Sequence, residues 1–234
     1  MLSVSKLITT SQFHKKSYFK FLTSFKKLGY NFISYKQIKK KNNILLRHDV
    51  DFSVDLAKKI AIWDHKQGIK SHFFFQYDSP FYNLGTHKNI ENLKLIKKLK
   101  HSIGFHISIK NFNTIRKDLL IFEKFLKVNG IKFNKIFSIH KIGSKKYNIK
   151  IPGYQNFFNF NSLGIYYSDS GGSFRFGNPL NNNEIIINKS SFQLNLHPIW
   201  WTSGNKIKKS NKIKNIKKLT TKIFDDELKT YRLL

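Results

Sequence analysis

The stretch NILLRHDVDFS at residues 43–53 joins an apolar run to a cluster of ionisable side chains. Residues 43–50 are long and apolar enough for a buried β-strand, and Ser53 can cap a helix whose apolar positions recur as far as Gly68. Strands that are apolar along their whole length are typical of parallel sheets, because helices cover both faces of such sheets. The stretch therefore predicts the first β–α unit of a parallel α/β fold.

The same alternation continues on both sides of this stretch. Apolar periodicity predicts helices over residues 11–28, 54–68, 89–100 and 112–128 and after 219, and strands over residues 43–50, 71–76, 103–107, 132–140, 165–169, 184–188 and 192–197. Four or more β–α units in 234 residues fit a barrel or a doubly wound sheet, and periodicity alone does not separate the two. No Gly-rich phosphate-binding motif follows the first strand, which argues against a nucleotide-binding fold.

The chain is strongly basic, with 43 Lys and Arg against 13 Asp and Glu and a formal net charge of +30. Only four of the basic residues are Arg, whose forked guanidinium is the group that phosphate and base recognition favours. Abundant Lys, Ile, Asn and Phe beside little Ala is also what A/T-rich codons produce. We therefore expect no specific nucleic-acid partner from the charge alone.

Several other classes of protein are excluded by composition. The absence of Cys removes disulfides, zinc ribbons and thiol nucleophiles, so that a metal site would have to use His, carboxylate and water. With 40% hydrophobic residues the chain can build a core and is not a disordered tail. No apolar run approaches the ~18 residues of a membrane helix, and no secretory signal is recognisable. The expectation is a cytoplasmic protein without a transmembrane segment.

Ionisable side chains close the predicted strands. The first strand ends in His48–Asp51, and later strands end at His106, His140, Asp169 and His197, with no Lys among them. Ligand sites of parallel α/β folds lie at this carboxyl edge. Asp and His together suit Zn²⁺, Mn²⁺, Fe²⁺ or Co²⁺, and such an ion lowers the pKa of its bound water toward ~7. The alternative interpretation is structural: Asp49 or Asp51 would cap the next helix, and the histidines would be core residues.

Six stretches resemble the polysaccharide deacetylases of carbohydrate esterase family four, and in particular an HDVD-containing branch associated with surface-polysaccharide gene clusters. They are ILLRHDVDFS (44–53), GIKSHFFFQYDSPFYN (68–83), HSIGFHISI (101–109), FSIHKIG (137–143), YYSDSGGSFRFGNP (166–179) and LNLHPIWW (194–201). The resemblance implies an α/β fold, a distorted (β/α)7 barrel in a single domain. Within it, residues 1–43 would be an N-terminal helical cap packed on the barrel, 44–203 the barrel core, and 204–234 a Lys-rich C-terminal helical segment.

The resemblance also implies one divalent transition metal, with Zn²⁺ the first expectation and Mn²⁺, Fe²⁺ or Co²⁺ as alternatives. Asp51 and His106 match two of its ligands. The family's second metal-binding histidine falls at Lys110, which cannot coordinate while charged. His140 is the expected substitute for the third ligand, and His197 is the fallback.

For the reaction, Asp49 resembles the catalytic base and His197 the general acid. Asp169 would orient or charge-stabilise His197, and Arg175 would hold the base or a substrate oxygen. The aromatic residues proposed for substrate contact are Tyr82, Trp200 and Trp201, with Phe81 and Tyr167 as further stacking candidates.

The implied function is hydrolysis of the N-acetyl group of an amino sugar in a polysaccharide or its precursor, so the expected partner is a small-molecule or oligosaccharide substrate. A second hypothesis is a catalytically degenerate relative that binds glycan. A third is a polyanion-binding protein that uses its basic tail: Lys206, Lys208, Lys209, Lys212, Lys214, Lys217 and Lys218. The sequence does not define the oligomeric state.

Overall fold

The computed structural model describes residues 13–37, 41–108, 114–140, 149–159 and 165–202, together with residues 214, 217, 218, 221 and 225. The strands are β1 (Asn31–Phe32), β2 (Asn43–Val50), β3 (His72–Phe75), β4 (Ser102–Ser108), β5 (Ile136–His140), β6 (Gln155–Asn156), β7 (Tyr166–Ser168) and β8 (Phe192–Asn195). The helices are α1 (Lys15–Lys27), α2 (Val54–Lys66), α3 (His87–Lys98), α4 (Ile115–Val128), α5 (Asn183–Ile186) and α6 (Pro198–Thr202).

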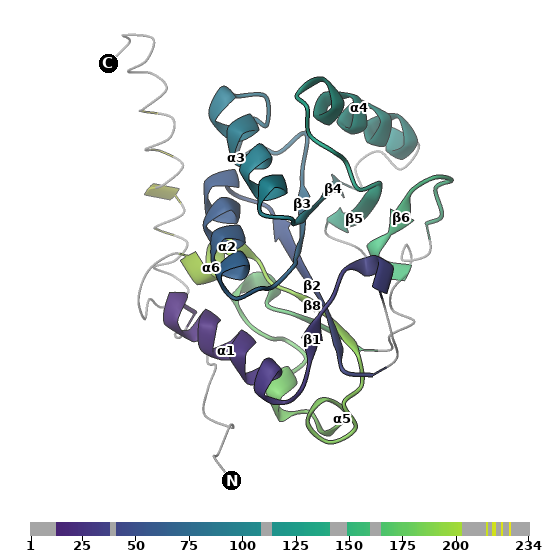
Figure 1. The fold of residues 1–234 in the computed structure, drawn as a ribbon. Helices are drawn as coiled ribbons and strands as arrows, with labels where there is room; N and C mark the ends of the chain where they lie inside the picture. The colour runs from purple at the N-terminus through teal and green to yellow at the C-terminus, as the bar shows by residue number, and fades with distance from the viewer. Residues whose placement is uncertain are drawn as a thin grey trace.

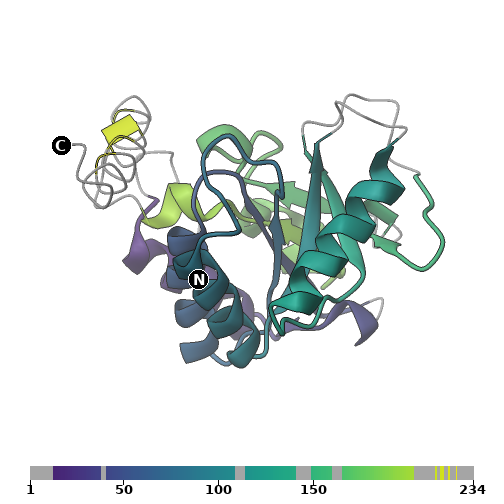
Figure 2. The same cartoon turned by 90° about the horizontal axis from the view of Figure 1, so that it is seen from above.

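Seven parallel strands form one sheet in the order β6-β5-β4-β3-β2-β8-β7, and β1 pairs with the beginning of β2 (Figure 1). Seen from above, the sheet curls, and α2, α3 and α4 lie outside the curve (Figure 2). This curled half-barrel with helices on its outer side confirms the predicted distorted (β/α)7 barrel.

The two faces of β2 explain why every residue of this strand is buried. Successive side chains of a strand point to opposite faces. Ile44 and Leu46 join the large hydrophobic core that the helices share, whereas Leu45 joins a smaller cluster with Phe74, Ile136 and Phe157. Arg47 and Asp49 follow Leu45 on its side of the strand, so their buried ion pair lies inside the curl.

A glycine in β4 allows the strands to approach one another inside this curl. A Cβ atom built on Gly104 would lie 2.6 Å from the Phe74 ring and 2.8 Å from the Ile136 side chain. Real Cβ atoms do not approach other atoms so closely, because such contacts are strongly repulsive. Gly104 is therefore required by packing.

Helix α1 packs on α6 through aromatic side chains. The ring of Trp201 in α6 lies 5.3 Å from that of Tyr18 and 5.8 Å from that of Phe21, both in α1, and 4.4 Å from that of Phe13, which precedes α1. Trp201 is 1% exposed as a result. The N-terminal helix thus covers the segment that follows β8.

Two predicted strands differ from the structure. Residues 184–188 were expected to form a strand, but α5 begins there because the Asn182 side chain accepts a hydrogen bond from the Glu184 amide and caps a helical turn. The strand predicted over 132–140 begins only at Ile136, because Lys135 has a left-handed φ of 52° that breaks the extended conformation. A helix cap outweighed the β-branched composition of residues 184–188, and a left-handed turn residue delayed the start of β5.

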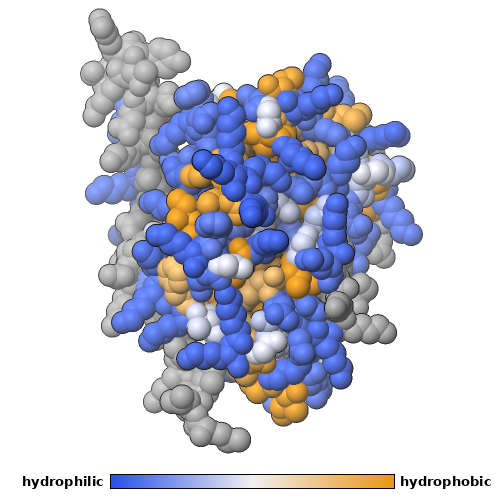
Figure 3. Space-filling model, viewed as in Figure 1, coloured by the Kyte–Doolittle hydropathy of each residue, from blue (hydrophilic) through white to orange (hydrophobic). Residues whose placement is uncertain are grey.

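The face shown in Figure 3 is mostly hydrophilic, with scattered hydrophobic patches. None of the described helices is long and apolar enough to cross a membrane. Most of the Lys-rich segment 204–234 lies outside the described residues, and residues 214, 217, 218, 221 and 225 are helical. The division into cap, barrel core and C-terminal segment stays a prediction, as does the cytoplasmic location.

Candidate metal centre and active site

Three donor atoms converge at the carboxyl edge of the sheet, from Asp51 after β2, His106 in β4 and His140 at the end of β5. Nε2 of His106 lies 3.3 Å and Nδ1 of His140 lies 3.1 Å from Oδ1 of Asp51. The two imidazole nitrogens are 3.1 Å apart. Ligands ~2.1 Å from a tetrahedral ion are separated by ~3.4 Å, so these donors fit a single divalent ion of the zinc type.

Neighbouring side chains orient these donors. The other ring nitrogen of His106 is 2.7 Å from the hydroxyl of Ser138 on β5, which fixes the orientation of the imidazole. The amide of Gln76, the residue after β3, donates to Asp51 Oδ1 at 3.1 Å and lies 3.4 Å from His140 Nδ1. Burial alone would raise the pKa of Asp51, but its contacts with the histidines hold that pKa well below the usual range, so the carboxylate is ionised.

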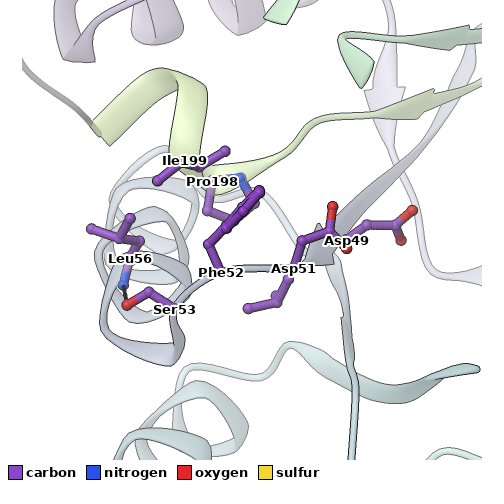
Figure 4. A pocket seen from close by; sticks show the side chains of 8 residues that line it. Asp49, Asp51, Phe52, Ser53, Leu56, Pro198 and Ile199 are labelled. Carbon is purple, nitrogen blue, oxygen red and sulfur yellow. Dashed lines mark hydrogen bonds between the residues drawn. The ribbon is translucent and has the colours of Figure 1, made fainter. Parts of the chain in front are cut away.

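Asp49 lies beside this cluster and is held by Arg47 from the same strand (Figure 4 shows Asp49 and Asp51 at the end of β2). Arg47 Nε donates to Oδ1 and Nη2 to Oδ2, both at 2.7 Å, and Asn195 Nδ2 donates to Oδ2 at 2.9 Å. Burial opposes ionisation of Asp49, but the Arg47 guanidinium holds the pKa of the carboxyl well below its usual range. Oδ2 of Asp49 is 3.9 Å from Nε2 of His106, within reach of the same bound molecule.

His197 approaches the cluster from the segment after β8. Its Nδ1 is 2.6 Å from Asp169 Oδ1, and Trp201 Nε1 donates to the other oxygen of Asp169 at 2.7 Å. Burial alone would lower the pKa of His197, but Asp169, with help from Asp51 and Asp49, raises it to about 9. The Nε2 atom faces Asp51 Oδ2 at 3.8 Å, so a protonated imidazole points toward the donor cluster.

The structure thus brings together Asp49, Asp51, His106, His140 and His197, with Asp169 behind His197. Lys110 and residues 141–148, which include the end of the stretch 137–143, lie outside the described residues.

Two of the expectations for other side chains are wrong. Trp201 has no free ring face for a sugar, because it is 1% exposed and packed against α1. Arg175 does not hold the base; it is exposed after β7, and Arg47 occupies that role by its two hydrogen bonds to Asp49. Substrate contact by Arg175 stays a prediction.

Tyr82 and Trp200 are placed by other contacts. The hydroxyl of Tyr82 donates to the Val50 carbonyl at 2.7 Å and accepts a hydrogen bond from the backbone N–H of Gln76 at 2.9 Å. Trp200 is 7% exposed, and a Cβ on Gly172 would lie 3.3 Å from its ring. Substrate contact by these two residues also stays a prediction.

Sequence reasoning missed four side chains of the site: Arg47, Gln76, Ser138 and Asn195. A signal existed for Arg47, because residues i and i+2 of a strand share a face and an Arg two residues before an Asp can pair with it. Gln76 closes the predicted strand 71–76, at a position like those of the acids and histidines that were singled out. Ser138 and Asn195 become visible only once the pairing of β4 with β5 and of β2 with β8 is known.

No protein-family model matches the chain, and no curated protein matches it. Among solved structures it is similar to the chitin deacetylase of the fungal pathogen Colletotrichum lindemuthianum (13% identity, 78% of this chain and 84% of that chain, TM-score 0.49). It is also similar to a Bdellovibrio bacteriovorus peptidoglycan deacetylase (16% identity, 78% and 51%, TM-score 0.45) and to a carbohydrate esterase family-four pseudoenzyme from Bacillus anthracis (15% identity, 75% and 60%, TM-score 0.42).

The chain therefore spans about half to three fifths of the length of the last two structures. These three structures are thus a chitin deacetylase, a peptidoglycan deacetylase and a family-four pseudoenzyme, and none of their names refers to the HDVD branch. Identities this low assign no role to a residue, and the roles considered below rest on the contacts of this chain.

Proposed function

We propose that the chain is a metal-dependent deacetylase that hydrolyses the N-acetyl group of an amino sugar. The observation that carries the proposal is the convergence of an Asp–His–His donor set with an ionised Asp49 on one side and a protonated His197 on another. Zn²⁺ is the proposed ion, and Mn²⁺, Fe²⁺ or Co²⁺ would suit the same nitrogen and oxygen donors. A divalent ion held by Asp51, His106 and His140 would polarise the acetyl carbonyl and acidify a water.

The proposed roles of Asp49 as base and of His197 as acid follow from the protonation states of the two side chains. Asp49 remains ionised at neutral pH, so it can accept a proton from the attacking water. His197 has a raised pKa and remains protonated at neutral pH, so it can donate a proton to the amine that leaves. Asp169 holds His197 Nδ1, which leaves Nε2 as the atom that donates. Acetate and a free amino sugar would result.

One observation favours a second candidate, a glycan-binding protein without turnover. Both oxygens of Asp49 already accept hydrogen bonds, from Arg47 and Asn195, and a carboxylate with a strongly lowered pKa is a weak base. This candidate retains the fold and the donor cluster but predicts no product.

Acetate release separates the two candidates. Metal content of the purified chain is measured by mass spectrometry, and acetate is then assayed with N-acetylglucosamine oligomers as substrates. The hydrolase predicts about one equivalent of metal in the wild type, loss of metal in Asp51→Ala, and loss of acetate release with retained metal in Asp49→Asn. If the metal-loaded wild type binds the oligomers but releases no acetate, the proposal of a hydrolase is rejected in favour of a glycan-binding protein.

A further inference from the structure

A cavity of about 310 Å³ lies at the amino edge of the sheet, the edge opposite to the donor cluster. Its wall includes Ser71 and His72 at the beginning of β3 and Ser102 at the beginning of β4, whereas Asp51, His106 and His140 stand toward the carboxyl ends of strands. The four steps of chain from His72 to Gln76 separate the two edges by roughly 13 Å. The cavity is therefore distinct from the candidate active site.

Three lysines surround this cavity, and the sheet register explains why two of them are neighbours. Lys70 and Lys100 each stand two residues before a strand, and the strands that follow are paired in parallel with His72 opposite Ser102. The Ser102 amide also donates to the Ser71 carbonyl at 3.0 Å, which continues the pairing toward the lysines. Lys36 comes to the same cavity from the 3₁₀ turn Tyr35–Gln37.

None of these lysines is neutralised within the described part of the chain. All three are exposed, and no ion pair between described residues involves any of them. The cavity lining contains no carboxylate. The carboxylate behind its wall is that of Asp64, which accepts hydrogen bonds from Tyr18 and Ser71 and is paired with His48.

The remaining lining groups are neutral hydrogen-bonding groups. Ser34 and Ser102 carry hydroxyls and Gln37 carries an amide. His72 forms part of the wall as a neutral side chain: its Nδ1 is 2.8 Å from the Leu46 carbonyl, its Nε2 accepts from the Tyr35 amide, and burial lowers its pKa to about 4. The cavity thus combines a positive rim with neutral donors in its wall.

We propose that this cavity binds a small molecule that carries one or two phosphoryl groups. Lysine ammonium groups act as point-charge partners of phosphate, and hydroxyl and amide donors satisfy the remaining oxygens. The volume lies at the lower end of the range of small-molecule sites, ~300–1,000 Å³. Lysines are abundant throughout this chain, but Lys36, Lys70 and Lys100 share one cavity. The inference does not rest on the proposed hydrolase activity.

Calorimetric titration of the full chain with inorganic phosphate and with pyrophosphate, at fixed ionic strength, tests the proposal. The site variant is Lys36→Gln/Lys70→Gln/Lys100→Gln. The matched control, Lys16→Gln/Lys59→Gln/Lys124→Gln, removes the same charge from exposed positions on α1, α2 and α4. Asp51→Ala is a second control, which tests whether the pyrophosphate binds at the candidate metal centre instead.

We expect saturable binding of one equivalent in the wild type, in the control and in Asp51→Ala, weakened roughly tenfold or more in the site variant, because charge-assisted hydrogen bonds are lost. Equal weakening in the site variant and the control would show that general surface charge is responsible and would overturn the proposal. Loss of binding in Asp51→Ala, or no saturable binding of either phosphate by the wild type, would overturn it as well. None of these outcomes decides whether acetate is released.

Discussion

Arg47 and Asp49 lie on the same side of β2 and form an ion pair with two hydrogen bonds inside the curl of the sheet. Both hydrogen bonds are 2.7 Å long, and the Arg47 guanidinium lies over the rings of Phe74 and Phe158, at 5.3 and 5.0 Å from their centres. Arg47 is 1% exposed and Asp49 4%. Neither charge can be removed alone without leaving the other unpaired in an apolar environment.

Replacement of Arg47 should therefore destabilise the fold. We expect Arg47→Met to lower the free energy of unfolding by about 3 kcal/mol, because Asp49 would remain buried without its partner. Denaturant unfolding followed by circular dichroism measures the change. Arg116→Met, on the exposed face of α4, should change it by no more than about 0.5 kcal/mol. Similar values for the two variants would mean that the buried ion pair contributes nothing to stability.

Gln76 should strengthen metal binding through Asp51. Removal of its amide in Gln76→Ala leaves Asp51 Oδ1 without that donor, and we expect the affinity for Zn²⁺ to fall about tenfold. Competition with a chromophoric chelator measures the affinity in the absence of any substrate. The exposed Gln155→Ala serves as the control, and an unchanged affinity in Gln76→Ala would show that Gln76 has no part in the site.

The proposed proton donation by His197 should end at alkaline pH. Because the pKa of His197 is raised to about 9, the rate of acetate release is expected to fall as pH rises through that value and the imidazole loses its proton. In Asp169→Asn the carboxylate that raises the pKa is gone, so the alkaline limb should move to lower pH. The pH dependence of kcat/KM checks this, with Asp118→Asn on α4 as the control. An alkaline limb at the same pH in wild type and Asp169→Asn would exclude His197 as its origin.

Acid should destabilise the fold through His72. The folded state keeps His72 neutral down to a pKa of about 4, whereas in the unfolded chain it is protonated below ~6.5. Between these values the unfolded state binds more protons, so the free energy of unfolding falls by about 3 kcal/mol as pH decreases and is fully retained above ~6.5. His72→Asn should lose less stability over this range than the wild type, and His87→Asn, at an exposed position, should follow the wild type. If the stability of His72→Asn depended on pH as strongly as that of the wild type, His72 would not be the cause of the acid destabilisation.

The packing at Gly104 predicts a purely steric effect. Gly104→Ala should cost about 1–3 kcal/mol, because its methyl group would overlap the Phe74 ring and the Ile136 side chain. The same substitution in a Phe74→Leu background should cost less, since the ring is removed. The wild type, the two single variants and the double variant form a double-mutant cycle, and their unfolding midpoints measure the energetic coupling between residues 74 and 104. Strictly additive costs would mean that the strain arises elsewhere.

The residues at the carboxyl edge could be predicted because their signals are local. Strand β2, its two acids and the cap at Ser53 are contained in one short stretch, and the parallel arrangement then brings His106 and His140 to the same edge. The contacts across strands could not be predicted in the same way. Asn195 reaches Asp49, and Ser138 reaches His106, only through a register that forms over long distances in the chain.

The role of Trp201 was mistaken for a related reason. Aromatic residues near a predicted active-site motif suggest sugar stacking, but whether a ring has a free face depends on what packs on it. In this chain α1 supplies that packing from nearly 200 residues away, and the sequence contains no local sign of it.

The same indole joins two distant parts of the molecule. Its rings contact the aromatic side chains of α1, while its N–H donates to the carboxylate that raises the pKa of His197. Contacts of Trp201 thus link the N-terminal helix to His197, the proposed proton donor. A substitution at Phe21 that loosens α1 could change the acidity of a group that it never touches.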